Sequence, residues 1–191
     1  MTKTSPLLRS FIAIPLPTPL TQQIAALQQQ LRQKAPQLKT PRPENLHLTL
    51  HFLGDQTQEL LAEVGQIMLS IGQKKKSFNV SLAGLGFFPN RRRPRVLWLG
   101  VEPAGGLSDL YQQLAVELAE LKIPTETRRY QPHLTIGRFR QTPHSTEPLC
   151  PFLSHNCGSM KINRMVLYSS ELTAKGAVHT PLTTAPFCAN N

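Results

Sequence analysis

Two short stretches of the chain alternate polar and apolar residues with a period of two. NLHLTLHF, residues 45–52, and QPHLTIGR, residues 131–138, both contain His-Leu-Thr followed by an aliphatic residue. Because successive side chains of a strand point to opposite faces, each stretch predicts a strand with an apolar face packed in the core. A histidine and a threonine then share the other face of each strand.

The two His-Leu-Thr strings lie 86 residues apart, and other features recur at that spacing. RSFIAIPLP, residues 9–17, and RVLWLGVEP, residues 95–103, are each typical of a short buried strand. Apolar residues at helical spacing follow both, within residues 19–36 and within residues 107–121. The repeated unit is therefore strand, helix, strand.

Further strands are predicted after each string, at residues 78–85 and 165–168, and a helix at about residues 57–71 precedes the first of these. The segment 140–158 is rich in Pro, Ser and Thr and predicts a long loop. The remaining Pro- and Arg-rich stretch, residues 89–95, predicts the connection between the two halves.

These elements predict an α+β fold in a single domain covering residues 1–191. The internal repeat divides it into roughly residues 8–88 and 94–184. We expect two pseudo-symmetric lobes, each a small, mostly antiparallel sheet backed by helices. The His-Leu-Thr strings then meet in a cleft between the lobes, where we expect the active site.

The composition of the chain indicates which class of substrate it favours. The 191 residues include 40% hydrophobic ones, enough for one sizeable core, and 21 Lys and Arg against 11 Asp and Glu give a net charge of +10. This imbalance favours a polyanionic substrate, although each basic cluster is also compatible with an ordinary solvated surface. The three cysteines form no disulfide or CxxC pattern and predict free thiols.

The apolar runs near the start of the chain are too short for a membrane span or a signal peptide. We therefore expect a cytoplasmic protein without membrane contact. No obligate protein partner is implied, and a monomer is expected.

The paired histidines point to acid–base chemistry. With a reference pKa of about 6.5, His47 and His133 can act as a general acid and a general base near neutral pH. The hydroxyl groups of Thr49 and Thr135 can donate to phosphoryl oxygens, and Arg138 can offset developing negative charge. The near symmetry of the two halves leaves open which histidine is the acid.

Three further polar residues bear on the predicted cleft. Arg138 lies five residues after His133, so strict alternation directs it to the opposite face unless a bulge at Gly137 turns it inward. His51 shares the His47 face but has a glycine as its counterpart, and we interpret it as peripheral. His179 lies near a predicted terminal strand without an evident partner.

No metal or other cofactor is expected. A metal site needs three or four ligands, whereas Glu44 and Asp55 are the only acidic residues near the first string, and none closely flanks the second.

The tetrapeptides His47-Leu-Thr-Leu50 and His133-Leu-Thr-Ile136 resemble the paired motifs of the 2H phosphoesterase superfamily. With RSFIAIPLP, PRVLWLGVE and LYSSEL in that order, the chain is similar to the RNA 2′,3′-cyclic phosphodiesterases, also called 2′-5′ RNA ligase-like proteins, over roughly residues 8–184. The resemblance implies a bilobed α+β fold. It also implies metal-independent hydrolysis of RNA 2′,3′-cyclic phosphate ends to 2′-phosphates, with 2′-5′ ligation as the reverse reaction.

The resemblance also implies roles for individual residues. His47 would protonate the departing 3′ oxygen, and His133 would accept a proton from the attacking water. Thr49 and Thr135 would hold the phosphate oxygens, and Arg138 matches the position of a substrate-binding arginine of the family.

Other interpretations remain open at this stage. Tyr130 or Phe11 could stack on the terminal base, as aromatic residues often do in single-stranded RNA recognition, or could simply pack in the core. A related enzyme could instead act on 2′-5′ oligoadenylates or on a cyclic phosphate of ADP-ribose. The positive charge is also compatible with a non-catalytic RNA-binding module.

Overall fold

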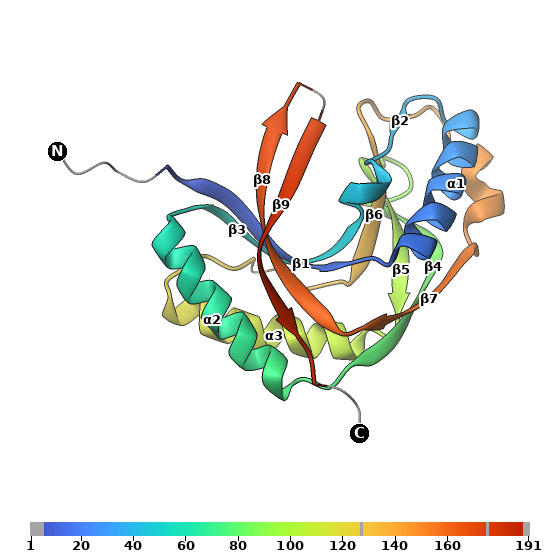
Figure 1. The fold of residues 1–191 in the computed structure, drawn as a ribbon. Helices are drawn as coiled ribbons and strands as arrows, with labels where there is room; N and C mark the ends of the chain where they lie inside the picture. Colours follow the sequence, from blue (N-terminus) through green and yellow to red (C-terminus); the bar gives the residue numbers. More distant parts are fainter. Residues whose placement is uncertain (1–5, 127, 175, 189–191) are drawn as a thin grey trace.

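The structure is a computed structural model that describes residues 6–126, 128–174 and 176–188. Strands, α-helices and two short 3₁₀ helices (η) follow one another along the chain (Figure 1). In order they are β1 (Leu8–Pro15), α1 (Thr18–Lys34), β2 (Leu38–Lys39), η1 (Pro43–Asn45), β3 (His47–Gln56), α2 (Gln58–Lys74), β4 (Phe78–Phe88), β5 (Val96–Glu102), α3 (Gly105–Glu120), β6 (His133–Phe139), η2 (Glu147–Phe152), β7 (Asn156–Ile162), β8 (Arg164–Thr173) and β9 (Gly176–Pro186).

The predicted strands and helices are found close to their expected positions. The helix expected at residues 57–71 begins one residue later, because the side chain of Thr57 caps it by accepting a hydrogen bond from the Leu60 amide at 3.3 Å. The prediction of one long loop at residues 140–158 was wrong in part. This segment contains η2 and the first residues of β7, whose exposed and buried positions do not alternate regularly.

The strands of the described residues form one continuous sheet in the order β7-β4-β5-β6-β3-β1-β8-β9, with the short β2 paired to β6. Each neighbouring pair in this order is antiparallel. The two half-sheets meet between β3 and β6, where Leu48 is the Cα partner of Leu134. The predicted α+β class is thus confirmed, and the two small sheets are joined edge to edge.

The two halves of the repeat exchange strands. β4, from the first half of the sequence, pairs with β5, whereas β8, from the second half, pairs with β1. The strand order is consequently symmetric about the β3–β6 junction, with β1 and β5, then β8 and β4, then β9 and β7 in equivalent places. Each half of the sheet therefore contains strands from both residues 8–88 and residues 94–184.

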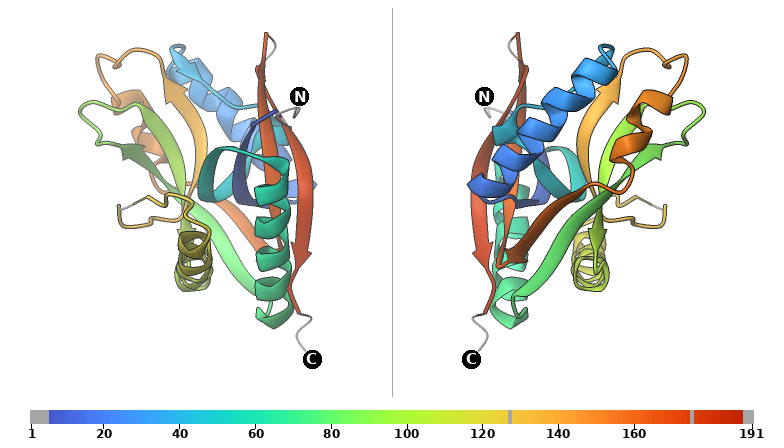
Figure 2. Two further views of the ribbon diagram at one scale, coloured as in Figure 1. Left: turned by 90° about the vertical axis from the view of Figure 1, so that its left-hand side faces the viewer. Right: turned by 90° about the vertical axis from the view of Figure 1, so that its right-hand side faces the viewer.

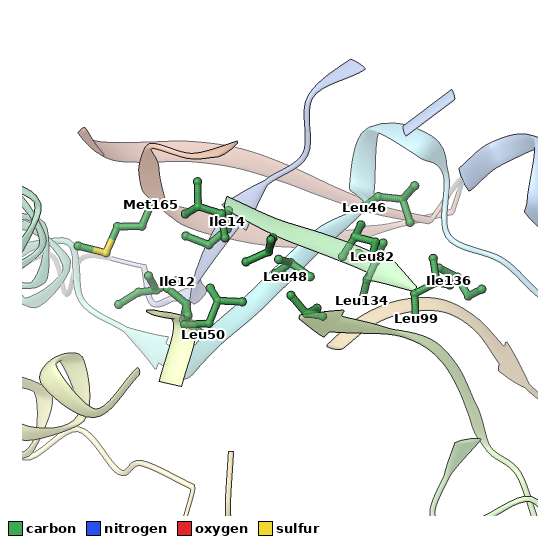
Figure 3. Close-up of a cluster of buried hydrophobic side chains, with 14 of the residues drawn as sticks. Ile12, Ile14, Leu46, Leu48, Leu50, Leu82, Leu99, Leu134, Ile136 and Met165 are labelled. Atoms are coloured by element: carbon green, nitrogen blue, oxygen red, sulfur yellow. The ribbon is translucent and has the colours of Figure 1, made fainter. Parts of the chain in front are cut away.

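The sheet is strongly curled, and its two ends diverge in the side views of Figure 2. Helix α1 packs against β6 and β7, whereas α2 packs against β8, β9 and α3. Buried aliphatic residues from β1, β3, β4, β5, β6 and β8 meet on one face of the sheet, as Figure 3 shows around Leu48 and Leu134. Both of these leucines are completely buried, so the polar residues beside them face the other way.

Candidate active site

The junction of β3 and β6 brings the two His-Leu-Thr strings together. Since Leu48 pairs with Leu134 in antiparallel register, His47 lies beside Thr135 and Thr49 lies beside His133. The four side chains line one cavity of about 580 Å³, which we call the histidine cleft. The pairing thus places each histidine next to the threonine of the other string.

Each imidazole ring is held by a hydrogen bond to the backbone oxygen of the residue two positions before it. Nδ1 of His47 lies 2.7 Å from the backbone oxygen of Asn45, and Nδ1 of His133 lies 2.8 Å from that of Gln131. Because a carbonyl oxygen only accepts hydrogen bonds, Nδ1 must carry the proton in each ring. Nε2 is then the atom of each histidine that can take up or release a proton.

His47 sits in an aromatic environment that disfavours its charged form. Its ring centroid lies 4.8 Å from that of Phe11 and 5.4 Å from that of His179, whose ring is nearly perpendicular to it. Burial lowers the pKa of His47 from 6.5 to about 4; the hydrogen bond to Asn45 opposes this fall, and the nearby His179 adds to it. In the unliganded protein His47 is therefore neutral at pH 7.

His133 is packed in a comparable way from the other half. The Phe88 ring meets it edge-on at 4.9 Å, and the Trp98 ring lies 6.3 Å away. Burial lowers the pKa of His133, and the charge of Arg138 lowers it further, whereas the hydrogen bond to Gln131 acts in the opposite direction.

A β-bulge at the same place in β3 and in β6 changes the alternation of side chains. The pairing of β1 with β3 leaves Leu50 as an extra residue, and the pairing of β5 with β6 leaves Ile136 as one. Arg138 and its repeat counterpart Phe52 consequently face the histidine cleft and line it. The structure thus contains the bulge that an inward-facing Arg138 requires.

The same bulge corrects the interpretation of His51. This residue does not share the His47 face, because the bulge turns it toward the interior, where it is 3% exposed. It stacks on Tyr111 at 4.1 Å, and its Nε2 lies 2.9 Å from the Tyr111 backbone oxygen. At the equivalent position, Gly137 leaves room for the Leu38 side chain, which a Cβ there would approach to 2.6 Å.

The two aromatic residues proposed to stack on a base occupy different environments. Phe11 lines the histidine cleft but is only 4% exposed, and its ring contacts His47, Tyr168 and His179. Tyr130 lies outside the lining of that cleft; its hydroxyl donates to the backbone oxygen of Thr49 at 3.0 Å. These contacts favour core packing for Phe11, whereas Tyr130 is half-buried and lines a neighbouring cavity.

The sequence analysis did not place two of the cleft residues in the site. Phe52 lines the cleft and is 59% exposed. It lies 86 residues before Arg138, so the repeat spacing could have indicated that the two residues occupy equivalent positions. His179 is not isolated, because β9 places it against His47 and Phe11. Its contact with His47 depends on the pairing of β9 with β8 and of β8 with β1, which no local pattern predicts.

The surroundings of the cleft are basic. Arg9, Arg42 and Arg138 line it, and Arg42 forms an ion pair with Glu44 at 3.8 Å. Within the described residues, no group of three or more His, Cys, Asp or Glu side chains is arranged to hold a metal ion. Cys150, Cys157 and Cys188 are free thiols, as predicted. None of the helices in the described ranges is long and apolar enough to cross a membrane.

Comparison with known proteins gives consistent matches over nearly the whole chain. The sequence model described as LigT like Phosphoesterase matches twice, over residues 14–98 and 99–179. The RNA 2′,3′-cyclic phosphodiesterase of Methanothermobacter thermautotrophicus is 34% identical over 91% of this chain and 96% of its own length. That of Thermotoga maritima is 31% identical over 92% of this chain and 93% of its own.

Solved structures agree with the sequence matches. A crystal structure from Thermus thermophilus superposes with a TM-score of 0.83 at 28% identity, covering 96% of this chain and 100% of the other. Escherichia coli LigT, crystallised with 3′-AMP, gives a TM-score of 0.78 at 28% identity, covering 95% and 98%. With two matches to the family model and relatives above 30% identity over most of its length, this chain belongs to the LigT-like phosphoesterase family.

Proposed function

We propose that this protein is an RNA 2′,3′-cyclic phosphodiesterase that opens cyclic phosphate termini to 2′-phosphates without a metal ion. The observation that carries the proposal is the shared lining of one cleft by both histidines and both threonines, at the junction of β3 and β6. Such an arrangement can place a proton donor and a proton acceptor on either side of one phosphorus atom.

In the proposed reaction, the oxygen of a water molecule attacks the phosphorus while the bond from phosphorus to the 3′ oxygen breaks. Nε2 of His133 accepts the proton of the water, and Nε2 of His47 donates a proton to the leaving 3′ oxygen. The product carries a 2′-phosphate and a 3′-hydroxyl group. The assignment of donor and acceptor follows the resemblance of the sequence to the family, because the geometry of the two rings is nearly equivalent.

The reaction needs one protonated histidine, and we expect that histidine to become protonated when the substrate binds. Burial lowers the pKa of both His47 and His133, so the free protein holds two neutral rings at pH 7. A phosphodiester anion in the cleft favours an imidazolium, because an opposite charge nearby raises the pKa of a histidine. We therefore expect one proton to be taken up when substrate binds.

The remaining cleft residues can stabilise the charge that develops on the phosphoryl oxygens. Thr49 and Thr135 lie beside the histidines at the β3–β6 junction, and both line the same cavity as Arg138. Hydrogen bonds from such groups to a charged oxygen are stronger than those between neutral groups. The relatives named RNA 2′,3′-cyclic phosphodiesterase, together with LigT bound to 3′-AMP, support a nucleotide phosphate ester as substrate.

The test is to incubate the protein with RNA that ends in a 2′,3′-cyclic phosphate and to identify the product isomer by chromatography. A 2′-phosphate product, formed equally well in EDTA, is expected. His47→Ala and His133→Ala should each abolish the activity while leaving the far-UV circular dichroism unchanged. A 3′-phosphate product, or near-full activity in either variant, would contradict the proposed mechanism.

The same assay separates the alternatives. Hydrolysis of 2′-5′ oligoadenylate or of an ADP-ribose cyclic phosphate in preference to RNA ends would retain the chemistry and change the substrate. Equal affinity for cyclic-phosphate and hydroxyl ends without turnover would instead favour a non-catalytic RNA-binding module.

A further inference from the structure

A second cavity of about 490 Å³ opens directly beside the histidine cleft. The two cavities share three lining residues, Thr49, Phe52 and His133. The second cavity extends away from the histidines toward the end of β4, the start of β5 and the loop that precedes β6. A ligand bound at the histidines can therefore extend directly into the second cavity.

The inner wall of the second cavity is a fixed stack of rings. His51 stacks on Tyr111 at 4.1 Å with an interplanar angle of 11°, and Tyr111 stacks on Tyr130 at 4.1 Å with an angle of 5°. The hydrogen bonds from Tyr130 to the Thr49 backbone and between His51 and the Tyr111 backbone hold this stack against β3. The wall is thus preorganised, and binding against it costs little side-chain entropy.

The rim of the second cavity carries three exposed guanidinium groups, those of Arg95, Arg128 and Arg129, against one carboxylate, that of Glu126. In the described part of the chain, no carboxylate lies within ion-pair distance of these three arginines. The Arg95 backbone is anchored on both sides, by hydrogen bonds of 2.8 Å to Phe88 and 2.9 Å to Phe139. The rim therefore attracts an anion, and the backbone of Arg95 is held in place beside it.

The chemistry of this cavity fits a nucleotide. Its inner wall carries the stacked rings of His51, Tyr111 and Tyr130, its rim is cationic, and Phe52 is exposed where the cavity joins the histidine cleft. Arginine and aromatic side chains bind the phosphates and bases of single-stranded RNA in the same way. A small neutral ligand would make no ionic contact with the arginines, and an inorganic anion would not stack on the aromatic rings.

We infer that the second cavity binds the nucleotide joined to the reacting terminus, so that the preferred substrate is an RNA chain and not a cyclic mononucleotide. This inference rests on the proposed function, since it assumes that the cyclic phosphate occupies the histidine cleft. It adds a binding site for the neighbouring nucleotide, with Arg95, Arg128 and Arg129 as its phosphate ligands.

The test compares adenosine 2′,3′-cyclic phosphate with the diadenosine dinucleotide that ends in the same group. At about 50 mM salt, where phosphate contacts are strong, we expect kcat/KM for the dinucleotide to be about tenfold higher or more. The double variant Arg95→Ala/Arg129→Ala should bring this ratio close to one. Lys161→Ala, which removes a charge from the exposed face of β7 outside both cavities, should leave the ratio unchanged.

Binding of the products gives a readout that does not need turnover. Isothermal titration calorimetry should show tighter binding of the dinucleotide 2′-phosphate than of adenosine 2′-phosphate, and the double arginine variant should lose this difference. Equal kcat/KM for the two substrates with equal affinity for the two products would overturn the second site and leave the proposed function intact. Preferential binding of the dinucleotide product without hydrolysis of either substrate would instead support the site and refute the proposed function.

Discussion

Replacing His47 with glutamine should remove most of its contribution to the acid sensitivity of the fold. Burial lowers the pKa of His47 from 6.5 to about 4, whereas the unfolded chain keeps a value near 6.5. Between these values the unfolded chain binds a proton that the folded chain does not, so stability falls as the pH is lowered from about 6.5 to about 4. Since one pKa unit corresponds to about 1.4 kcal/mol, His47 alone accounts for a loss of about 3 kcal/mol.

The assay is urea unfolding of the wild type and of His47→Gln at several pH values from 4 to 8, with stability taken from the midpoint and slope of each transition. The difference in stability between the two proteins should change by about 3 kcal/mol across this range, the variant being relatively more stable at low pH. His144→Gln, at an exposed loop position, should follow the wild-type profile. If His47→Gln shows the wild-type dependence on pH, His47 is not held as a buried neutral ring, and the derivation fails.

Further predictions concern the chemistry of the cleft. His133→Asn should lower kcat by about 10² to 10⁴, the usual loss when a general base is removed, as measured in single-turnover assays on cyclic-phosphate RNA. Thr135→Val should lower kcat/KM by about tenfold to a hundredfold through the loss of one hydrogen bond to a charged oxygen; an unchanged value would exclude that contact. His179→Gln should raise the pKa of His47, because His179 helps to lower it, and an NMR titration of the imidazole signals would detect the change or its absence. Removal of divalent ions with EDTA should leave the rate unchanged, whereas a loss restored by added metal would contradict the metal-independent mechanism.

Local patterns were sufficient for most of the helices and strands and for the faces of the two central strands, although they missed η2 and the start of β7. The period of two in each His-Leu-Thr string determines that histidine and threonine share a face, and the buried leucines beside them confirm it. The recurrence at 86 residues predicted that the halves are related, and the symmetric strand order about β3 and β6 agrees with this. The facing of the side chains depends only on neighbours along the chain, and the recurrence can be read directly from the sequence.

The alternation of polar and apolar residues could not predict the bulges at Leu50 and Ile136. A bulge inserts one residue without a distinctive composition, yet it reverses the facing of the side chains that directly follow it. This is why His51 was expected on the cleft face and lies in the core, and why the orientation of Arg138 was left conditional. The alternation also could not predict that β4 and β8 are exchanged between the halves, because strand pairing depends on contacts between distant segments.

The alternation of residues is enough to place two histidines and two threonines at matched positions on the polar faces of two strands. Strand pairing in the folded protein makes these strands neighbours, so that the four side chains line one cleft, and it brings His179 of β9 against His47. The difference arises because the facing of a side chain follows from the backbone period of its own strand. The order of strands in a sheet, and the burial that lowers the histidine pKa values, follow from packing between segments far apart in the chain.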